Sequence, residues 1–380
     1  MRQRQSKHTT FKNHFFHSSR WLVLLLTCSV CLGCFDSREE ARLAVEAGKQ
    51  ELPNNPQKAL IHFNRAILHD SRYAEAFAAR AAVFQQLQQP EFALSDWREA
   101  VRQKPDSAEY RYGLAWQYSY LDQPREAEQA LQVETLPDEL SAEWLGLQGR
   151  IQRQLGSLKD AVTLLNASLQ YNKERAETWL ELGRCQLLQR DSPAARDFFT
   201  EAIRWANTKE EPLLFAAHLA LAQVLMNEKK WEEAERELTL AQKFNPLDVE
   251  MLRRWAETKF ARGDFDAALQ YWQQVFSLRA PTAADWYGLA EVHRGKSQTE
   301  EAARAIQQAI TLNPEEAKYY LFRGRLALQQ QAWQQAILDF SQAIELGMNS
   351  AEVYFDRGTA WEALGETEQA QQDFAQAANP

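Results

Sequence analysis

Residues 286–314 read WYGLAEVHRGKSQTEEAARAIQQAITLNP, and the alanine at position 302 belongs to a regular series. Alanine recurs every 34 residues on both sides of it, with a single interval of 39. We call the members of this series the marker alanines: Ala59, Ala93, Ala127, Ala161, Ala195, Ala234, Ala268, Ala302, Ala336 and Ala370. A fixed period of about 20 to 50 residues indicates stacked units rather than one closed globule.

Other positions keep the register of the marker alanines and show what each unit is. Gly or Ala stands twelve residues before every marker, and a large apolar residue stands four residues after it. The step of four places the marker and the large residue on one face of a helix. Turn signals lie between the two helical stretches of a unit, as at Gly156-Ser157, Asp191-Ser192-Pro193 and Gly263-Asp264. Prolines end the second stretch in three units, at Pro105, Pro246 and Pro314. The sequence therefore predicts an all-α chain of helical hairpins about 34 residues long.

This pattern resembles the tetratricopeptide repeat family, whose motif is W-x2-L-G-x2-Y…A-x3-F…P. The motif is readable in the fifth and eighth units as Trp179, Leu182, Gly183, Ala195 and Phe199, and as Trp286, Leu289, Ala290, Ala302, Ile306 and Pro314. The resemblance implies a right-handed α-solenoid of about ten helix-turn-helix units over residues 40–380. The third unit departs from the pattern at Glu134 and Pro137, so we expect its second helix to be short.

The 39-residue interval adds five residues near Lys209-Glu210-Glu211-Pro212. We expect a lengthened connection at residues 210–214, which would divide the array into five repeats at 40–209 and five at 215–380. Residues 34–39 would form a tether ahead of the first repeat.

Residues 1–33 have the composition of a targeting segment. Five basic residues and no acidic one occupy positions 1–20, and thirteen mostly apolar residues follow at 21–33. Thirteen residues make about 20 Å of helix, too short for a hydrocarbon core of roughly 30 Å, so the segment reads as a secretory signal. The sequence Leu32-Gly33-Cys34 resembles a bacterial lipobox, which implies that Cys34 is lipidated and becomes the first mature residue. An uncleaved anchor and an ordinary cleaved signal are the alternatives.

Charge and motifs exclude several classes of function. Removing residues 1–33 moves the net charge from −9 to −14, and a chain this acidic without a basic stripe argues against nucleic acid as a partner. The mature chain contains no zinc-protease H-E-x-x-H, no nucleophile elbow and no phosphate-binding glycine loop. The repeats also leave no room for a catalytic domain. We expect neither enzyme activity nor a metal, a cofactor or a small-molecule substrate.

The candidate binding surface comes from the first helices of the third to fifth repeats. In the resembled family, residues 18, 15, 11, 8 and 7 before the marker form the inner surface of the superhelix. Most tryptophans fall on packing positions, but Trp116 lies one step after the small residue Ala115 and points away from the packing face. The predicted groove residues are Tyr112, Trp116, Tyr120, Arg150, Arg153, Arg184 and Leu187. The alternative is that Leu180 and Leu187 are partly packed and that the arginines pair with Glu143 and Glu177.

These observations predict a membrane-tethered, non-catalytic scaffold on the periplasmic or extracytoplasmic side. Its partner would be a protein or peptide of envelope assembly, secretion or polymer export, acidic or bearing a free C-terminal carboxylate. Phe35 rather than Asp after Cys34 favours the outer membrane under enteric-type sorting. The alternatives are an architectural scaffold that uses edge contacts only, and a soluble cytoplasmic adaptor.

Overall fold

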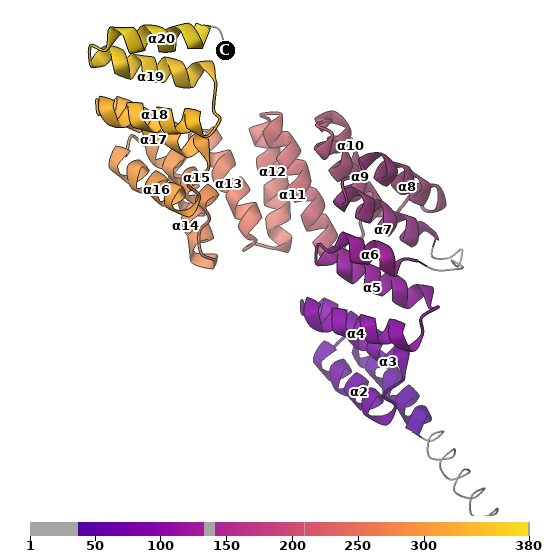
Figure 1. Ribbon diagram of the computed structural model, residues 1–380. Helices are drawn as coiled ribbons and strands as arrows, with labels where there is room; N and C mark the ends of the chain where they lie inside the picture. The colour runs from indigo at the N-terminus through magenta and orange to yellow at the C-terminus, as the bar shows by residue number, and fades with distance from the viewer. Residues whose placement is uncertain (1–36, 133–140, 209, 379–380) are drawn as a thin grey trace, which may run out of the picture. The chain divides into compact units, whose positions relative to one another are not determined.

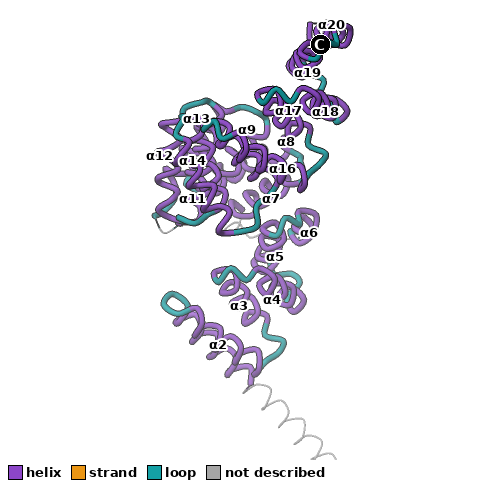
Figure 2. The backbone as a smooth tube through the Cα atoms, turned by 90° about the vertical axis from the view of Figure 1, so that its left-hand side faces the viewer, coloured by secondary structure: helices purple, strands orange, loops and turns teal. Residues whose placement is uncertain are grey.

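The computed structural model describes residues 37–132, 141–208 and 210–378. Every regular element in these ranges is a helix, and no strand occurs among them (Figure 2). The prediction of an all-α chain is confirmed. The predicted signal segment with Cys34, and Glu134 and Pro137 of the third repeat, lie outside the described residues.

The helices follow one another in antiparallel pairs (Figure 1). Residues 37–51 form the first helix and pair with α2 (Pro56–His69). Nine further pairs complete the array: α3 (Ala74–Gln86) with α4 (Pro90–Gln103), α5 (Ala108–Tyr120) with α6 (Pro124–Ala130), α7 (Ser141–Gln154) with α8 (Leu158–Tyr171), α9 (Ala176–Leu188) with α10 (Ser192–Trp205), α11 (Glu211–Asn227) with α12 (Trp231–Phe244), α13 (Val249–Ala261) with α14 (Phe265–Leu278), α15 (Ala283–Gly295) with α16 (Thr299–Leu312), α17 (Ala317–Gln329) with α18 (Trp333–Glu345), and α19 (Ala351–Ala363) with α20 (Thr367–Ala378).

The marker alanines are the contact points within each hairpin. All ten are at most 2% exposed. The small residues twelve positions earlier are buried in nine repeats, and in the fifth an added Cβ on Gly183 would lie 2.4 Å from the Phe199 ring. In the first repeat Ala47 is only half-buried, and Gly48 instead meets the Phe63 ring. The connection there has four residues (52–55) where all nine later hairpins have three, which changes the phase of the first helix against the second.

The three-residue connection inside each later hairpin has one conformation throughout. Its middle residue has a positive φ of 55–85° in all nine hairpins. Glycine occupies that position in three of them, and six carry other residues: Gln88, Asp122, Arg190, Lys229, Ser297 and Gln331. A residue with a Cβ is strained in this left-handed region, so these six turns are held by the packing of the two helices that they join.

Replacing such a residue by glycine should therefore stabilise the chain. We expect Gln331→Gly and Gln88→Gly each to stabilise it by about 0.5–1 kcal/mol, because the left-handed backbone no longer carries a Cβ. Urea denaturation followed by circular dichroism measures the effect. The matched control is Gly263→Ala, which places a Cβ at the same position of another turn and should lower stability by a similar amount. Equal midpoints for all three variants would contradict the explanation.

The helix ends agree with the prolines and the cap that the sequence contains. The helices α4, α12 and α16 end two residues before Pro105, Pro246 and Pro314, as expected. Asp191 is the N-cap of α10, and its side chain accepts a hydrogen bond from the backbone N–H of Ala194. The second helix of the third repeat is short, since α6 has only seven residues.

The predicted lengthened connection at residues 210–214 is wrong. Residues 211–214 belong to α11, which has 17 residues where the other labelled first helices have 13 or 14. The added turn is apolar, and Leu214 in it is buried. Pro212 is tolerated because it lies in the first turn of the helix. The extra residues therefore add a helical turn instead of a loop.

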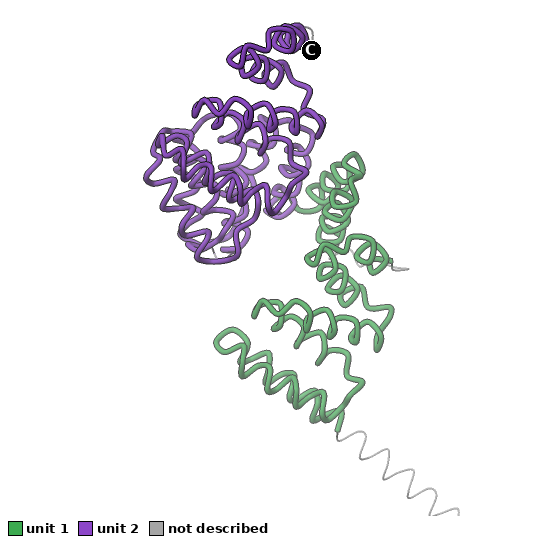
Figure 3. The backbone as a smooth tube through the Cα atoms, turned by 60° about the vertical axis from the view of Figure 1, so that its left-hand side comes forward, with its two compact units in different colours: residues 1–173 green, residues 174–380 purple. Residues whose placement is uncertain are grey.

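The chain divides into two compact units, residues 1–173 and 174–380 (Figure 3). We call them unit 1, with the first four hairpins, and unit 2, with the last six. The boundary between the units does not coincide with the 39-residue interval that divides 40–209 from 215–380, and α10 and α11 share one core cluster across that interval, with Phe199 and Ala202 against Ala217 and Leu221. Within each unit the second helix of a repeat packs on the first helix of the next, and neighbouring first helices also touch, as α5 and α7 do in unit 1 and α13 and α15 in unit 2.

Three repeats contain the same buried ion pair, which we call the arginine–aspartate clamp. The arginine lies 13 residues before the marker and the aspartate three after it, giving Arg80–Asp96, Arg323–Asp339 and Arg357–Asp373. Each arginine binds both carboxylate oxygens at 2.6–3.0 Å, and each aspartate is at most 4% exposed. A further guanidinium nitrogen donates to the preceding repeat, as Arg323 Nη1 does to Gln307 Oε1 at 2.6 Å. The clamp therefore joins the two helices of one hairpin and links that hairpin to its neighbour.

A second paired position lies between consecutive repeats. The large residue after the marker is tryptophan in two repeats, Trp97 and Trp272, and both side chains are buried. The residue 16 positions later is glycine in those two cases, and added Cβ atoms on Gly113 and Gly288 would lie 2.6 and 2.2 Å from the respective indole rings. Each indole therefore packs on the backbone of the next first helix.

Candidate protein-binding surface

The predicted residues of unit 1 lie on two neighbouring first helices, and we call them the aromatic–arginine surface: Tyr112, Trp116 and Tyr120 on α5, with Arg150 and Arg153 on α7. The Trp116 and Tyr120 rings stack with centroids 5.4 Å apart and planes 11° from parallel. The Arg150 guanidinium lies over Trp116 at 5.9 Å from the ring. Residues 11 and 7 positions before the markers thus lie side by side on α5 and α7.

Two hydrogen bonds fix α5 against α7 beside this cluster. The buried Ser119 hydroxyl donates to Gln154 Oε1 at 2.6 Å, and Gln154 Nε2 donates to the Ser119 carbonyl at 2.8 Å. Tyr112 lies two turns before Tyr120 on α5, half-buried, with its ring 6.5 Å from that of Trp144. The aromatic groups are therefore held by a rigid support, while Tyr120 is 53% exposed and accessible to a partner.

The two predicted residues of unit 2 have different surroundings. Arg184 Nη1 lies 2.6 Å from Glu181 Oε1, and Glu181 is buried, so this arginine already pairs with an acid of its own helix. Leu187 is half-buried against the core cluster that contains Leu180. The leucine part of the alternative reading is therefore correct, while Arg184 pairs with Glu181 and not with Glu177.

Unit 2 has a second group at the same repeat positions. Glu257 on α13 and Glu291 on α15 occupy the place that Trp116 and Arg150 hold in unit 1, 11 residues before the marker. Burial raises the pKa of both carboxyl groups, and nearby arginines only partly oppose this. The Tyr287 hydroxyl donates to Glu291 Oε1 at 3.3 Å, and burial raises the pKa of Tyr287 to about 12. Both side chains are half-buried, and periodicity could find these positions but not their raised pKa.

The raised pKa predicts how stability depends on pH. When the pKa of a carboxyl group is higher in the folded state than in the unfolded state, the folded protein becomes less stable as the pH rises through that pKa. Glu291→Gln keeps an acceptor for Tyr287 and removes the charge, so we expect it to raise the urea midpoint at pH 7. The gain should vanish below the ordinary carboxyl pKa of 4.5, because there the Glu291 side chain of the parent is as neutral as the glutamine of the variant. The control is Glu362→Gln at an exposed position of α19, and the same gain at both sites would contradict the assignment to burial.

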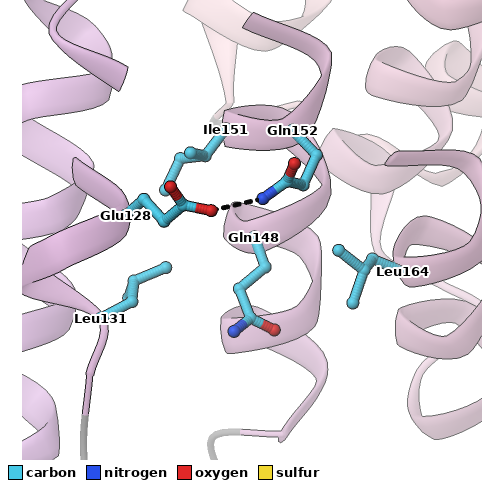
Figure 4. A pocket seen from close by; sticks show the side chains of 6 residues that line it. All are labelled: Glu128, Leu131, Gln148, Ile151, Gln152 and Leu164. Atoms are coloured by element: carbon cyan, nitrogen blue, oxygen red, sulfur yellow. Dashed lines mark hydrogen bonds between the residues drawn. The ribbon is translucent and has the colours of Figure 1, made fainter. Parts of the chain in front are cut away.

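Hollows in the described structure are small or open. In unit 1 a cavity of about 100 Å³ lies beside the short α6, lined by Leu131, Ile151 and Leu164, and Gln152 Nε2 donates to Glu128 Oε1 at its edge (Figure 4). Ligand pockets usually enclose about 300–1,000 Å³, so this cavity is too small for one. Two larger hollows, of about 480 and 420 Å³, lie beside α16 in unit 2 and share Arg304 and Gln308.

The described residues contain no group of three or more His, Cys, Asp or Glu side chains placed to hold a metal ion. Among the same residues, no helix combines the length and the apolar character needed to span a bilayer. Cys185 is fully buried.

Comparisons with known proteins identify the repeat type. The family model described as "Tetratricopeptide repeat" matches residues 147–212 and 287–351. A search among curated proteins returns no match. The crystal structure of the "APC/C hetero-tetramer Cut9-Hcn1" is similar with a TM-score of 0.64 at 14% identity, and the alignment covers 81% of this chain. This chain spans 60% of the length of that one.

Two further solved structures align less closely. A tetratricopeptide repeat protein from Parabacteroides merdae ATCC 43184 gives a TM-score of 0.46 at 16% identity, with 80% of this chain and 99% of that chain covered. The MamA protein gives 0.39 at 21% identity, with coverages of 43% and 90%. The family match and the fold agree with the marker alanines. The chain therefore carries tetratricopeptide repeats at residues 147–212 and 287–351, and its described residues fold as an α-solenoid.

Proposed function

We propose that this protein is a non-catalytic scaffold that binds an acidic protein segment on the aromatic–arginine surface of unit 1. The observation that carries the proposal is the stacked pair of Trp116 and Tyr120 with the Arg150 guanidinium over the indole. Tryptophans at the packing positions, such as Trp97 and Trp272, are buried in the core. Trp116 is instead only half-buried, at the edge of the core cluster of unit 1.

The chemistry of this surface favours an acidic or carboxylate-bearing partner. Stacked aromatic rings offer large rigid contact area, and Trp, Tyr and Arg are the residue types that dominate binding energy at interfaces. Guanidinium groups bind carboxylates and backbone carbonyls through two parallel hydrogen bonds. The chain itself is acidic, with a net charge of −9, so a local pair of arginines beside aromatics is a selective feature of its surface.

Substitutions on this surface should weaken binding without unfolding the repeats. We expect Trp116→Ala and Arg150→Glu each to lower the affinity for the native partner about 30-fold, which corresponds to a loss of about 2 kcal/mol. A photo-crosslinking amino acid at Tyr120 in cells would capture the partner, and titration with the purified partner would measure the affinity. Peptides from the acidic segments of the partner are then compared, each made once with a free and once with an amidated C-terminus. Equal binding of the two forms indicates recognition of acidic side chains, and weaker binding of the amidated form indicates recognition of the terminal carboxylate.

Two controls separate binding from folding. The crosslinker at Phe355, an exposed aromatic on α19 in unit 2, should not capture the same partner. Gly183→Leu should disturb packing against Phe199 and lower helicity, whereas the two surface variants should keep the parent's circular dichroism spectrum. If both surface variants remained helical and bound the partner normally, the architectural scaffold with edge contacts would be the better reading.

The proposal includes a membrane tether at Cys34, on the extracytoplasmic side, in envelope assembly, secretion or polymer export. It is supported by the basic and apolar segment that ends in Leu32-Gly33-Cys34. Metabolic labelling with a fatty-acid analogue tests it, since Cys34→Ala should lose all label. A variant that kept the label would place the lipid elsewhere, and a wild-type chain without label in the soluble fraction would favour the cytoplasmic adaptor.

A further inference from the structure

The first repeat differs from the others on the outer face of its second helix. Four exposed residues of α2 follow one another at helical spacing, Lys58, Ile61, Arg65 and Leu68, and we call them the α2 stripe. Steps of three and four place them on one side of the helix. Leu68 is 86% exposed, the highest value among the large apolar side chains of the described residues, and Ile61 is 66% exposed. Two apolar groups therefore alternate with two cations on a solvent-facing stripe.

The internal repeats show that packing does not require this stripe. Ile61 and Leu68 lie two and nine residues after the marker, and only the first repeat is apolar at both positions. The second repeat has Ser95 and Arg102 there, and the fifth has Asp197 and Arg204. The ninth has Leu338, which is 64% exposed, but Glu345 follows it. The apolar and cationic pattern is thus a property of the repeat closest to Cys34.

The geometry of the first hairpin brings the stripe to the proposed anchor. His69 Nδ1 lies 2.7 Å from Glu40 Oε2, so the end of α2 is beside residue 40 of the first helix. Glu40 follows Cys34 by six residues, which reach at most about 20 Å when extended. A lipid on Cys34 would therefore hold Leu68 and Arg65 close to the bilayer, while the charge of the whole chain would repel an anionic surface.

We propose that the α2 stripe lies against an anionic lipid surface and fixes the orientation of unit 1 at its membrane. This proposal rests on the tether of the proposed function and adds the face that meets the lipid. Exposed apolar side chains flanked by cations are typical of helices that lie in the plane of a membrane interface. Ile61 and Leu68 would enter the headgroup region, and Lys58 and Arg65 would contact lipid phosphates, with Arg72 following just beyond the helix.

The test uses the full mature chain, purified from membranes with its lipid and reconstituted into vesicles. An environment-sensitive fluorophore is attached at Ser71→Cys, in the connection after α2, and in a matched sample at Ser350→Cys, in the connection after α18. The buried Cys185 will not react in the folded chain. The vesicles contain phosphatidylcholine alone or phosphatidylcholine with phosphatidylglycerol at about 3:1.

We expect the chain to float with both kinds of vesicle, because the tether does not depend on charge. The fluorescence emission of the probe at position 71 should shift to shorter wavelength only with vesicles that contain phosphatidylglycerol. The emission of the probe at position 350 should not shift with either kind of vesicle. Lys58→Glu and Arg65→Glu should each lower the ratio of docked to undocked chains about fivefold. This is the usual contribution of one basic residue near an anionic surface. Ile61→Asn should abolish the shift, whereas Leu338→Asn, at the same repeat position and of similar exposure, should leave it intact.

The outcomes separate this proposal from the one on which it rests. Flotation with a water-exposed Ser71 probe in both vesicle types would overturn the docking surface and leave the tether standing. Failure to float would overturn the tether, and the docking surface with it. A blue shift without vesicles that grows with protein concentration would show that a second copy of the chain covers the stripe, and would overturn lipid as its occupant.

Discussion

Replacement of Arg323 by leucine is expected to destabilise the ninth repeat by about 3–5 kcal/mol. The Asp339 carboxylate is 2% exposed and receives both of its guanidinium hydrogen bonds from Arg323. Removing one partner of a buried ion pair leaves an uncompensated charge in a medium that solvates it poorly. Urea denaturation should show an unfolding transition at a lower urea concentration than in the parent, and hydrogen exchange should locate the loss of protection in α17 and α18.

The double variant separates the missing arginine from the buried charge. Arg323→Leu with Asp339→Leu should recover most of the loss, because well-packed apolar residues replace a buried ion pair at little or no cost. The fifth repeat already has an apolar pair, Leu182 and Phe198, at the same two positions. A single variant that lost less than about 1 kcal/mol would show that water reaches Asp339 and that the clamp contributes little.

Replacement of Gly288 by leucine is expected to open the contact between the seventh and eighth repeats, at a cost of about 3 kcal/mol. An added Cβ would lie 2.2 Å from Trp272 Cζ2, and the indole is 2% exposed. Hydrogen exchange should show the loss in α14 and α15, and the far repeats should keep their protection because each repeat contacts only its neighbours.

A compensating change at Trp272 provides the control. Gly288→Leu with Trp272→Leu should restore most of the stability, since the third and fourth repeats place Leu131 and Leu147 at these two positions. Trp272→Leu alone should destabilise by leaving a cavity against Gly288. If the double variant were no better than Gly288→Leu, the backbone of α15 rather than the indole would limit the packing.

The sequence by itself determined the architecture of this protein. In a repeat array each contact recurs at a fixed spacing, so the marker alanines and the large residues four positions later report helix contacts without any knowledge of long-range folding. The same register located Trp116, Tyr120 and Arg150 on neighbouring first helices, and the structure stacks the two rings and places the guanidinium over the indole. Pro105 and Asp191 likewise marked helix ends, because their effects act on the local backbone.

Only the tertiary structure decided how the repeats differ from one another. Five extra residues predicted a loop, but Leu214 gains burial by extending α11, and burial depends on neighbours that a pattern does not show. The left-handed residues Gln88 and Gln331 carry no glycine signal, because the helices on both sides impose that conformation. The Asp339 clamp joins residues 16 apart, and its strength comes from a low-dielectric site that exists only after packing. Local spacing thus set the repeat, while burial set the identity of each contact.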